Sequence, residues 1–466
     1  MIYQTVTEMV DAVEPAAITL GDRVSVRNAG ALTGEVVDRL VWTSVFGADA
    51  GLRGTARWLT RSIAAAAGIR PASMHELYMA IGRGETGGFT VPAINVRAMA
   101  YDTARAVVRA AMALEAGAVI FEISRGEMAY TRQRPHEYAA SVIGAALREG
   151  YSGPLFIQGD HVQIDAKKYH GADRDQELAA VRALIAEELA AGFYNIDIDA
   201  STVVDLTQPT LAAQQAVNSR LAAELTAFVR EREPRGITVS LGGEIGEVGG
   251  RNSDVHELRA FMAGYRDALR AAGSAGISKI SVQTGTTHGG VVNADGTVGA
   301  DVAIDFETLT DLSRVGRTEY GLAGAVQHGA STLPLDAFAA FPRAGACEIH
   351  LATEFQNIMY EHPRFPPDLK AQMYAWVQEH GAGDRHADDT EPQFIYRSRK
   401  KAIGAFKRQL WSLEADVRRA IATALQDRFA LLMRRLNVAG TAGLVSRYVD
   451  PPPVILVREA EIEAAQ

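Results

Sequence analysis

Eight short hydrophobic runs, separated by longer segments, organise the middle of this chain. Runs of this length bounded by glycine or turn residues are typical of buried strands. The predicted strands cover residues 88–96, 119–124, 155–161, 194–200, 237–246, 280–285, 322–328 and 348–353. Between them, apolar residues recur at helical spacing over residues 101–116, 174–191, 211–233 and 255–272. Strands that alternate with helices in this way predict an α/β fold, a (β/α)8 or TIM barrel.

A barrel of this type needs about 250 residues, so a chain of 466 residues must carry additions. We expect an N-terminal extension over residues 1–72 and the barrel over residues 73–354. A C-terminal helical extension then covers residues 355–466. For the N-terminal extension we expect a role in packing or in the formation of an oligomer.

The extensions carry little chemistry in their sequences. In the first, residues 22–27 are predicted to form a short strand, and residues 34–46 and 52–67 are predicted to form helices. In the second, the helical segment 395–413 contains six basic residues, Arg397, Arg399, Lys400, Lys401, Lys407 and Arg408. Such a run is usually a solvated helix face. Contact with phosphate or with another subunit is the alternative.

Composition and charge narrow the classes of function. The net charge of −9 argues against general nucleic-acid binding. The sequence has no apolar stretch of transmembrane length and does not start with a signal-peptide pattern, so we expect a cytoplasmic protein without a membrane partner. Cys347 is the only cysteine, which excludes an internal disulfide and a cysteine zinc site. We interpret it as a buried packing residue.

Three histidines close predicted strands or follow them directly. His161, His288 and His328 each come after an apolar run with glycine nearby. The carboxyl ends of parallel barrel strands meet at one mouth, so side chains far apart in sequence can converge there. Three neutral imidazoles with an open fourth position make a catalytic zinc site. One such histidine is more often a satisfied polar residue, but the threefold repetition favours a metal site.

Two carboxylates accompany these histidines. Asp160 directly precedes His161, and side chains of neighbouring strand residues face opposite ways. A backbone turn at the strand end could still bring both to the mouth. Asp160 could then transfer protons to a metal-bound substrate, or it could orient a histidine. Glu244 ends the fifth predicted strand and is placed to serve the metal or its surroundings.

Small residues after two of the histidines predict an anion site. Gly289 follows His288, whereas Gly329 and Ser331 follow His328. Backbone amides and small hydroxyls in such loops bind phosphate and other anions. A tight turn without any ligand is the competing interpretation.

Six segments together resemble the class II, metal-dependent ketose-bisphosphate aldolases, which include fructose-bisphosphate and tagatose-bisphosphate aldolases. The resemblance runs from about Ser73 to Glu354 and is weaker in the C-terminal helices. The segments are Val-Pro-Ala-Ile-Asn-Val from Val91, Gly-Asp-His from Gly159, Asp-Ile-Asp-Ala-Ser from Asp197, Gly-Glu-Ile-Gly from Gly243, Thr-His-Gly from Thr287 and Gln-His-Gly from Gln327. Their order and spacing are specific, although no single segment is.

The resemblance implies an aldehyde-lyase that reversibly cleaves a phosphorylated ketose, such as fructose 1,6-bisphosphate, to dihydroxyacetone phosphate and an aldehyde. Asp160 would handle the proton on the hydroxyl of the bond being broken. The divalent metal, usually zinc, would be held by His161, His288 and His328, with Glu244 near it. Contacts to substrate and phosphate would come from Asn95, Ser124, Gly289, Gly329, Ser331 and Thr353. A homodimer or homotetramer with a phosphorylated sugar as substrate is expected.

The chain departs from the family pattern around the substrate. A lysine is missing after the second histidine, and His350 replaces an asparagine of the last strand. The family's paired acids, one of them a catalytic base, correspond to Arg251 and Asn252, which leaves Glu247 or Asp254 as the candidate base. We therefore expect a divergent subgroup. Its alternatives are an aldolase for a non-bisphosphorylated or sulfonated sugar, and a non-catalytic structural or regulatory subunit.

Overall fold

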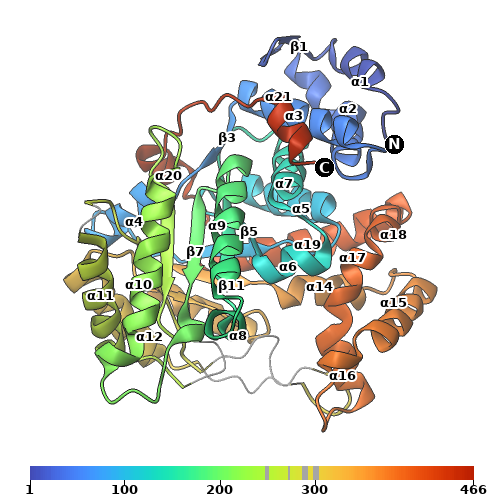
Figure 1. Ribbon diagram of the computed structural model, residues 1–466. Helices are drawn as coiled ribbons and strands as arrows, with labels where there is room; N and C mark the ends of the chain where they lie inside the picture. Colours follow the sequence, from blue (N-terminus) through green and yellow to red (C-terminus); the bar gives the residue numbers. More distant parts are fainter. Residues whose placement is uncertain (247–250, 271–272, 286–291, 298–303) are drawn as a thin grey trace.

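The computed structural model describes residues 1–246, 251–270, 273–285, 292–297 and 304–466. Its centre is a closed barrel of parallel strands, from β4 to β11 in chain order, in which β11 pairs with β4 (Figure 1). The strands are β4 (Val91–Asn95), β5 (Ile120–Ser124), β6 (Gly153–Gln163), β7 (Asn195–Asp199), β8 (Ser240–Glu244), β9 (Lys279–Val282), β10 (Ala325–Gln327) and β11 (Glu348–Leu351). The predicted TIM barrel is confirmed, and each predicted strand overlaps one observed strand.

A ninth strand, β3 (Ile69–Ala72), joins the same sheet. It runs parallel to the first half of β6, whereas β7 pairs with the second half. The buried amide of Asn195 joins the three strands, because its Nδ2 donates to the carbonyl oxygens of Ala72 and Ile157, at 3.1 Å each. The sequence analysis did not predict β3. It ends at residue 72, the expected boundary between extension and barrel, and that boundary stays a prediction.

Helices cover the outside of the barrel, and the hydrophobic core lies between them and the sheet. They are α5 (Ala100–Ala113), α6 (Arg125–Thr131), α7 (Pro135–Arg148), α8 (Ala166–His170), α9 (Arg174–Ala191), α10 (Leu211–Arg230), α11 (Val255–Leu269), α12 (Phe306–Tyr320) and α13 (Ala340–Ala344). The four predicted helices correspond to α5, α9, α10 and α11. Cys347 is buried in this core, as expected. No helix in the described part of the chain is long and apolar enough to cross a membrane.

Both chain ends pack together at the end of the barrel away from α8 (Figure 1). The N-terminal elements are α1 (Val6–Val13), β1 (Ala17–Leu20), β2 (Arg23–Val26), α2 (Glu35–Phe46), α3 (Ala50–Ala66) and α4 (His75–Gly82). The last helix, α21 (Arg458–Glu463), lies against α3. A Cβ atom on Gly54 would come within 2.4 Å of the Ile462 Cα, so only glycine allows this approach.

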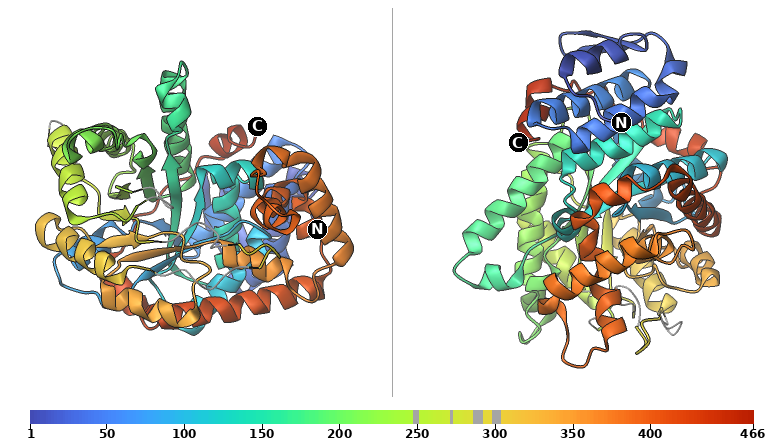
Figure 2. Two further views of the ribbon diagram at one scale, coloured as in Figure 1. Left: turned by 90° about the horizontal axis from the view of Figure 1, so that it is seen from below. Right: turned by 90° about the vertical axis from the view of Figure 1, so that its right-hand side faces the viewer.

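The C-terminal helices wrap one side of the barrel (Figure 2). They are α14 (Thr353–Tyr360), α15 (Pro367–His380), α16 (Glu391–Ser398), α17 (Ala402–Ala405), α18 (Lys407–Trp411), α19 (Ala415–Arg435) and α20 (Ala442–Tyr448), with the short 3-10 helix η6 (Arg399–Lys401) after α16. The basic segment 395–413 is therefore broken into short turns. The segment packs closely on α6 at Gly404 in α17, because a Cβ there would come within 2.2 Å of the Tyr130 carbonyl oxygen.

The interpretation of this basic segment as a solvated face is wrong for Arg399. Arg399 is only 4% exposed. Its guanidinium pairs with Glu361 and donates to Asn357 Oδ1 at 2.8 Å and to the Tyr374 hydroxyl at 3.0 Å. Arg399 therefore anchors η6 to α14 and α15.

Candidate active site and metal centre

The irregular end of β6 brings two neighbouring side chains into one cavity. The pairing of β6 with β7 shifts register between Gly159 and Val162, and His161 has a φ of 42°, in the left-handed region. This irregularity overrides the alternation of a regular strand, so that both Asp160 and His161 line the cavity. The cavity has a volume of about 1080 Å³, which is ample for a sugar phosphate.

Three donor side chains converge in this cavity. They are His161 of β6, Glu244 at the end of β8 and His328 directly after β10. One ligand atom of each lies within 4.8 Å of the others, and the imidazole centroids of His161 and His328 are 4.2 Å apart. Imidazole and carboxylate donors so close together suit zinc and related divalent ions. His288 and Gly289, predicted for the same mouth, lie outside the described residues.

Asp199 at the end of β7 orients one of these donors. Its Oδ2 lies 3.1 Å from His161 Nδ1, and its Oδ1 accepts hydrogen bonds from the backbone N–H and the hydroxyl of Ser201. A carboxylate that holds one imidazole nitrogen fixes the ring so that the other nitrogen can face a metal. The sequence analysis quoted Asp199 within a family segment but gave it no role.

Glu244 and His161 shift each other's pKa values, because they lie side by side in a buried cluster. Burial raises the pKa of Glu244 to about 7, and Asp199 adds to this rise while His161 opposes it. Burial would lower the pKa of His161, but Asp160 and Glu244 outweigh it and hold this pKa well above its usual value. Because metal ligands must be deprotonated, a divalent cation would displace protons from this pair.

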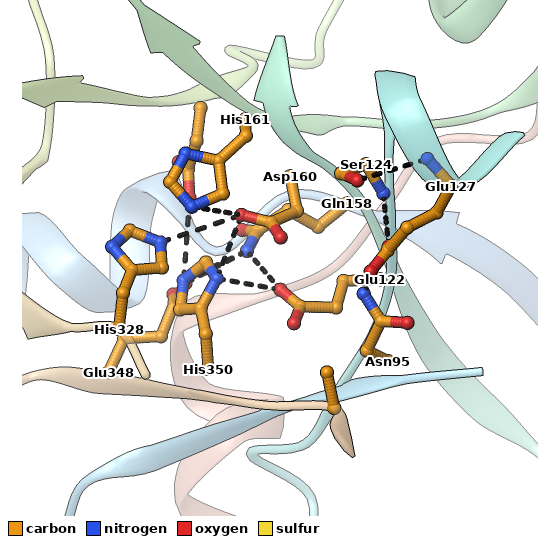
Figure 3. Close-up of polar contacts among 12 residues, drawn as sticks. Asn95, Glu122, Ser124, Glu127, Gln158, Asp160, His161, His328, Glu348 and His350 are labelled. Atoms are coloured by element: carbon orange, nitrogen blue, oxygen red, sulfur yellow. Dashed lines mark hydrogen bonds and ion pairs between the residues drawn. The ribbon is translucent and has the colours of Figure 1, made fainter. Parts of the chain in front are cut away.

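Asp160 lies among three histidines (Figure 3). Its Oδ1 is 3.0 Å from His350 Nδ1, 3.5 Å from His328 Nε2 and 3.9 Å from His161 Nε2. Burial would raise the pKa of Asp160, yet His161 and His350 hold it well below the usual range. Asp160 is therefore an ionised carboxylate beside the donor cluster, as a proton acceptor at this position must be.

The barrel interior beneath Asp160 is polar, which the sequence analysis did not predict. Alternation along β11 points both Glu348 and His350 inward, and His350 contacts Glu122, Asp160 and Glu348. Lys279, at the start of β9, is fully buried and pairs with Glu348. Polar residues at alternate positions of these strands were a usable signal, because a strand buried on both faces is expected to be apolar.

Five predicted substrate contacts line the cavity: Asn95, Ser124, Gly329, Ser331 and Thr353. The Ser124 Oγ accepts from the backbone N–H of Glu127 at 3.3 Å, and the Ser331 Oγ accepts from that of Ala352 at 2.6 Å. These contacts use acceptor lone pairs of the two hydroxyls rather than their donor hydrogens. Both serines thus suit an anionic ligand.

Comparison with known families agrees with this arrangement. Residues 76–411 match the family described as Fructose-bisphosphate aldolase class-II, which is well over half of the chain. The chain belongs to this family. Its members are typically metal-dependent lyases, and the donor cluster of this class II aldolase is consistent with a divalent metal site. No curated protein matches the sequence.

Solved structures with TM-scores above 0.5 share the fold of this class II aldolase at low sequence identity. A probable tagatose 6-phosphate kinase from Sinorhizobium meliloti is 18% identical, with a TM-score of 0.54 over 80% of this chain and 97% of that chain. A fructuronate-tagaturonate epimerase from Cohnella laeviribosi is 12% identical, with a TM-score of 0.52 over 90% and 93%. A fructose-bisphosphate aldolase from Campylobacter jejuni is 18% identical, with a TM-score of 0.46 over 80% and 96%.

The candidates for a second base in this aldolase have other contacts or are not described. Asp254 caps α11, where its carboxylate accepts the backbone N–H groups of His256 and Glu257. Arg251 pairs with Glu257 and is half exposed. Glu247 lies outside the described residues. Asp160 is therefore the carboxylate that the structure places in the cavity beside the donor cluster.

Six basic residues line the aldolase cavity: Arg97, Arg125, Lys167, Lys168, Arg397 and Lys400. Arg97 pairs with Glu127 at 2.5 Å and donates to Gln356, so its charge is compensated. Lys400 of η6 also lines the cavity, 5.9 Å from the centre of the Tyr130 ring. Within the described part of the chain, Lys400 forms no hydrogen bond or ion pair, and burial followed by Arg97 lowers its pKa. Lys400 is thus a cavity-lining lysine without a direct ion pair among the described residues, although Glu127 and Asp384 lie near enough to raise its pKa.

Proposed function

We propose that this protein reversibly cleaves a phosphorylated ketose into dihydroxyacetone phosphate and an aldehyde, with zinc as its metal. The observation that carries the proposal is the convergence of His161, Glu244 and His328 beside the ionised Asp160 in one cavity. The same cavity has hydroxyl and amide groups suited to phosphate. Fructose 1,6-bisphosphate is the first substrate to test.

The chemistry assigns a separate task to each group. His161, Glu244 and His328 would hold the metal, which supplies Lewis-acid polarisation of a carbonyl when bound. Asp160 accepts the proton of the C4 hydroxyl while the C3–C4 bond breaks, and C4 becomes the aldehyde carbon. The electron pair of that bond remains with C3, next to the ketone. In the reverse direction, Asp160 returns its proton to the newly formed hydroxyl.

The two anionic ends of the substrate are proposed to bind on different sides of the mouth. Gly329, Ser331 and Thr353 follow β10 and β11, and they would bind the phosphate of the dihydroxyacetone phosphate half. Ser124 ends β5 and caps α6, and Lys400 lies near Tyr130 of the same helix. This second pair would bind the far end of the sugar.

A sugar with a different anionic far end is the second candidate substrate. The observation that favours it is Lys400, because an ammonium group is a point charge and does not impose the fork geometry by which arginine selects phosphate. A sulfonate or carboxylate could therefore replace the far phosphate. The expected homodimer or homotetramer remains a prediction.

A panel of ketoses tests the proposal. The enzyme, loaded in turn with zinc, manganese and cobalt, is incubated with fructose 1,6-bisphosphate, tagatose 1,6-bisphosphate and ketose 1-phosphates that carry a sulfonate, a carboxylate or no charge at the far end. We expect release of dihydroxyacetone phosphate from at least one, and loss of that activity after chelation. Six-carbon products are analysed as well, because re-addition of the aldehyde would give an epimer. A metal-loaded enzyme that neither cleaves nor epimerises any of them would contradict the proposal.

A further inference from the structure

His350 is the buried hub beneath Asp160 (Figure 3). Its Nδ1 lies 3.0 Å from Asp160 Oδ1 and 2.9 Å from Glu122 Oε2. On the other side of the ring, its Nε2 lies 2.7 Å from Glu348 Oε1. Both ring nitrogens are therefore engaged by carboxylates, and the ring has one orientation that satisfies all three.

Glu348 is itself fixed from three directions. Its Oε1 accepts from Gln158 Nε2 at 2.9 Å and from the Lys279 ammonium group, and its Oε2 accepts from the Tyr78 hydroxyl. Glu348, Gln158, Lys279 and Tyr78 are all completely buried. Because each donor is immobilised by packing, Glu348 offers His350 a rigid acceptor rather than a flexible one.

This network meets the substrate cavity through His350. Glu122, Asp160 and His350 line the cavity, whereas Glu348, Lys279 and Tyr78 do not. A purely structural network gives little reason to bury so many charged groups, since well-packed apolar residues of similar volume are often at least as stable. The arrangement instead resembles the support that a reacting group needs to stay in one geometry.

We infer that His350 is a positioning residue that holds the Asp160 carboxylate in place, and that Glu348 fixes His350 for this task. The inference rests on the proposed function, in which Asp160 moves the substrate proton. The competing role is that of a metal ligand, because His350, Asp160, Asp197 and His328 also bring donor atoms within 4.8 Å of one another. The carboxylates at 2.7–3.0 Å from both His350 nitrogens favour the positioning role.

The variant His350→Ala separates these roles. Misplacement of a catalytic group by about 1 Å can cost roughly 100-fold in rate, so we expect kcat to fall about 10- to 100-fold with little change in KM. Metal content should stay at the wild-type level, and added imidazole, which can enter through the cavity, should restore part of kcat. His75→Asn, a change at another buried histidine that does not line the cavity, is the matched control and should leave kcat unchanged.

A double-variant cycle tests the connection to Asp160. If His350 acts through Asp160, His350→Ala should cost little further activity in an Asp160→Ala background. Glu348→Gln should lower kcat in the same direction as His350→Ala but less, because an amide oxygen can still accept from Nε2. An equal loss in both backgrounds, or loss of metal from His350→Ala, would overturn the inference.

A readout without catalysis keeps this inference separate from the proposed function. The ring nitrogens of His350 are observed by 15N NMR in the zinc-loaded protein, with His350→Ala used for assignment. We expect Asp160→Ala to shift Nδ1 and Glu348→Gln to shift Nε2. Shifts of this kind in an enzyme that cleaves no ketose would support the network while the proposed reaction fails. Unchanged His350 signals would overturn the inference whatever the reaction is.

Discussion

At the scale of single residues, the backbone of His161 explains how two adjacent side chains share one site. A non-glycine residue in the left-handed region costs of the order of 1 kcal/mol or more, and His161 adopts it with a φ of 42°. Such strain persists where surrounding contacts hold it, and the hydrogen bond from His161 to Asp199 is one such contact. The strained turn keeps Asp160, the proposed proton acceptor, next to His161, a proposed metal ligand.

The roles of these neighbours predict different outcomes for two alanine variants. Asp160→Ala should keep its metal and lose roughly two to four orders of magnitude in kcat, the usual contribution of a general acid–base residue. His328→Ala should lose both metal and activity, because it removes a donor from the cluster. Elemental analysis after dialysis and steady-state kinetics on the same preparations measure both quantities.

The control for these two variants is His256→Ala, an exposed histidine on α11, which should match the wild type in metal and rate. If Asp160→Ala loses its metal, Asp160 belongs to the coordination shell and not to proton transfer. If folded His328→Ala keeps a full complement of metal, the donor cluster is assigned wrongly.

Residues at strand ends were predictable, whereas residues inside strands were not. His161, Glu244 and His328 were identified because barrel chemistry concentrates at the carboxyl ends of strands. His350 was compared only with the family's asparagine, so its downward contact with Glu348 was missed. The alternation of Glu348 and His350 along β11 was a usable local signal, whereas the pairing of Glu348 with Lys279 of β9 depends on how the strands face one another inside the barrel.

At the scale of elements, the contact between α9 and β6 places a buried acid behind the active-site strand. Glu188 of α9 is completely buried, and neither of its carboxylate oxygens has a hydrogen-bond partner among the described residues. A Cβ atom on Gly159 would come within 2.6 Å of both oxygens, so glycine is required there. Burial, with a smaller effect of Glu187, raises the pKa of Glu188 well above its usual value.

This raised pKa predicts that Glu188 makes stability fall with rising pH. The folded chain keeps the Glu188 proton, whereas the unfolded chain releases it above about pH 4.5. The free energy of unfolding therefore decreases by up to about 1.4 kcal/mol per pH unit until the folded carboxyl ionises. Glu188→Gln should remove this dependence, so its stability relative to the wild type should be higher at pH 8 than at pH 5. Urea unfolding of the wild type and of Glu188→Gln at pH 5 and pH 8, with a chelator present, measures this difference.

Glu187→Gln is the matched control, because Glu187 is the adjacent residue and pairs with Arg134 at the surface. Glu187→Gln should change the free energy of unfolding by a similar amount at pH 5 and at pH 8. A Glu188→Gln difference from the wild type that is the same at both pH values would show that Glu188 ionises normally in the folded chain.

A helix or strand was predictable where apolar residues recur along its own sequence at the spacing of that element. The barrel strands are short apolar runs, and α9 begins and ends where its pattern does. The strand β3 was missed because Ile-Arg-Pro-Ala is short and contains a proline, and its pairing with β6 is set by tertiary packing. The basic segment was predicted as one helical stretch, whereas the structure divides it among α16, η6, α17 and α18.

At the scale of the whole molecule, the two extensions have different relations to the site. The N-terminal helices and α21 are held together by Arg61 and Glu461, whose carboxylate also lies 2.9 Å from His136 Nδ1. This contact lies at the end away from α8 and secures the chain ends. The C-terminal helices instead reach the mouth, where η6 contributes Lys400 to the cavity. The extension that follows the barrel thus forms part of the cavity wall.

Lys400→Met therefore tests whether the C-terminal extension contributes to substrate selection. A charge-assisted hydrogen bond contributes about 1.5–3 kcal/mol, so its loss should raise KM for a ketose bisphosphate roughly 10- to 100-fold. A ketose 1-phosphate without a far anion should show little change, because only the far end would meet Lys400. Lys401→Met is the matched control, since the adjacent Lys401 pairs with Asp384 and does not line the cavity. Equal effects on both substrates, or the same KM change in Lys401→Met, would show that Lys400 does not read the far anion.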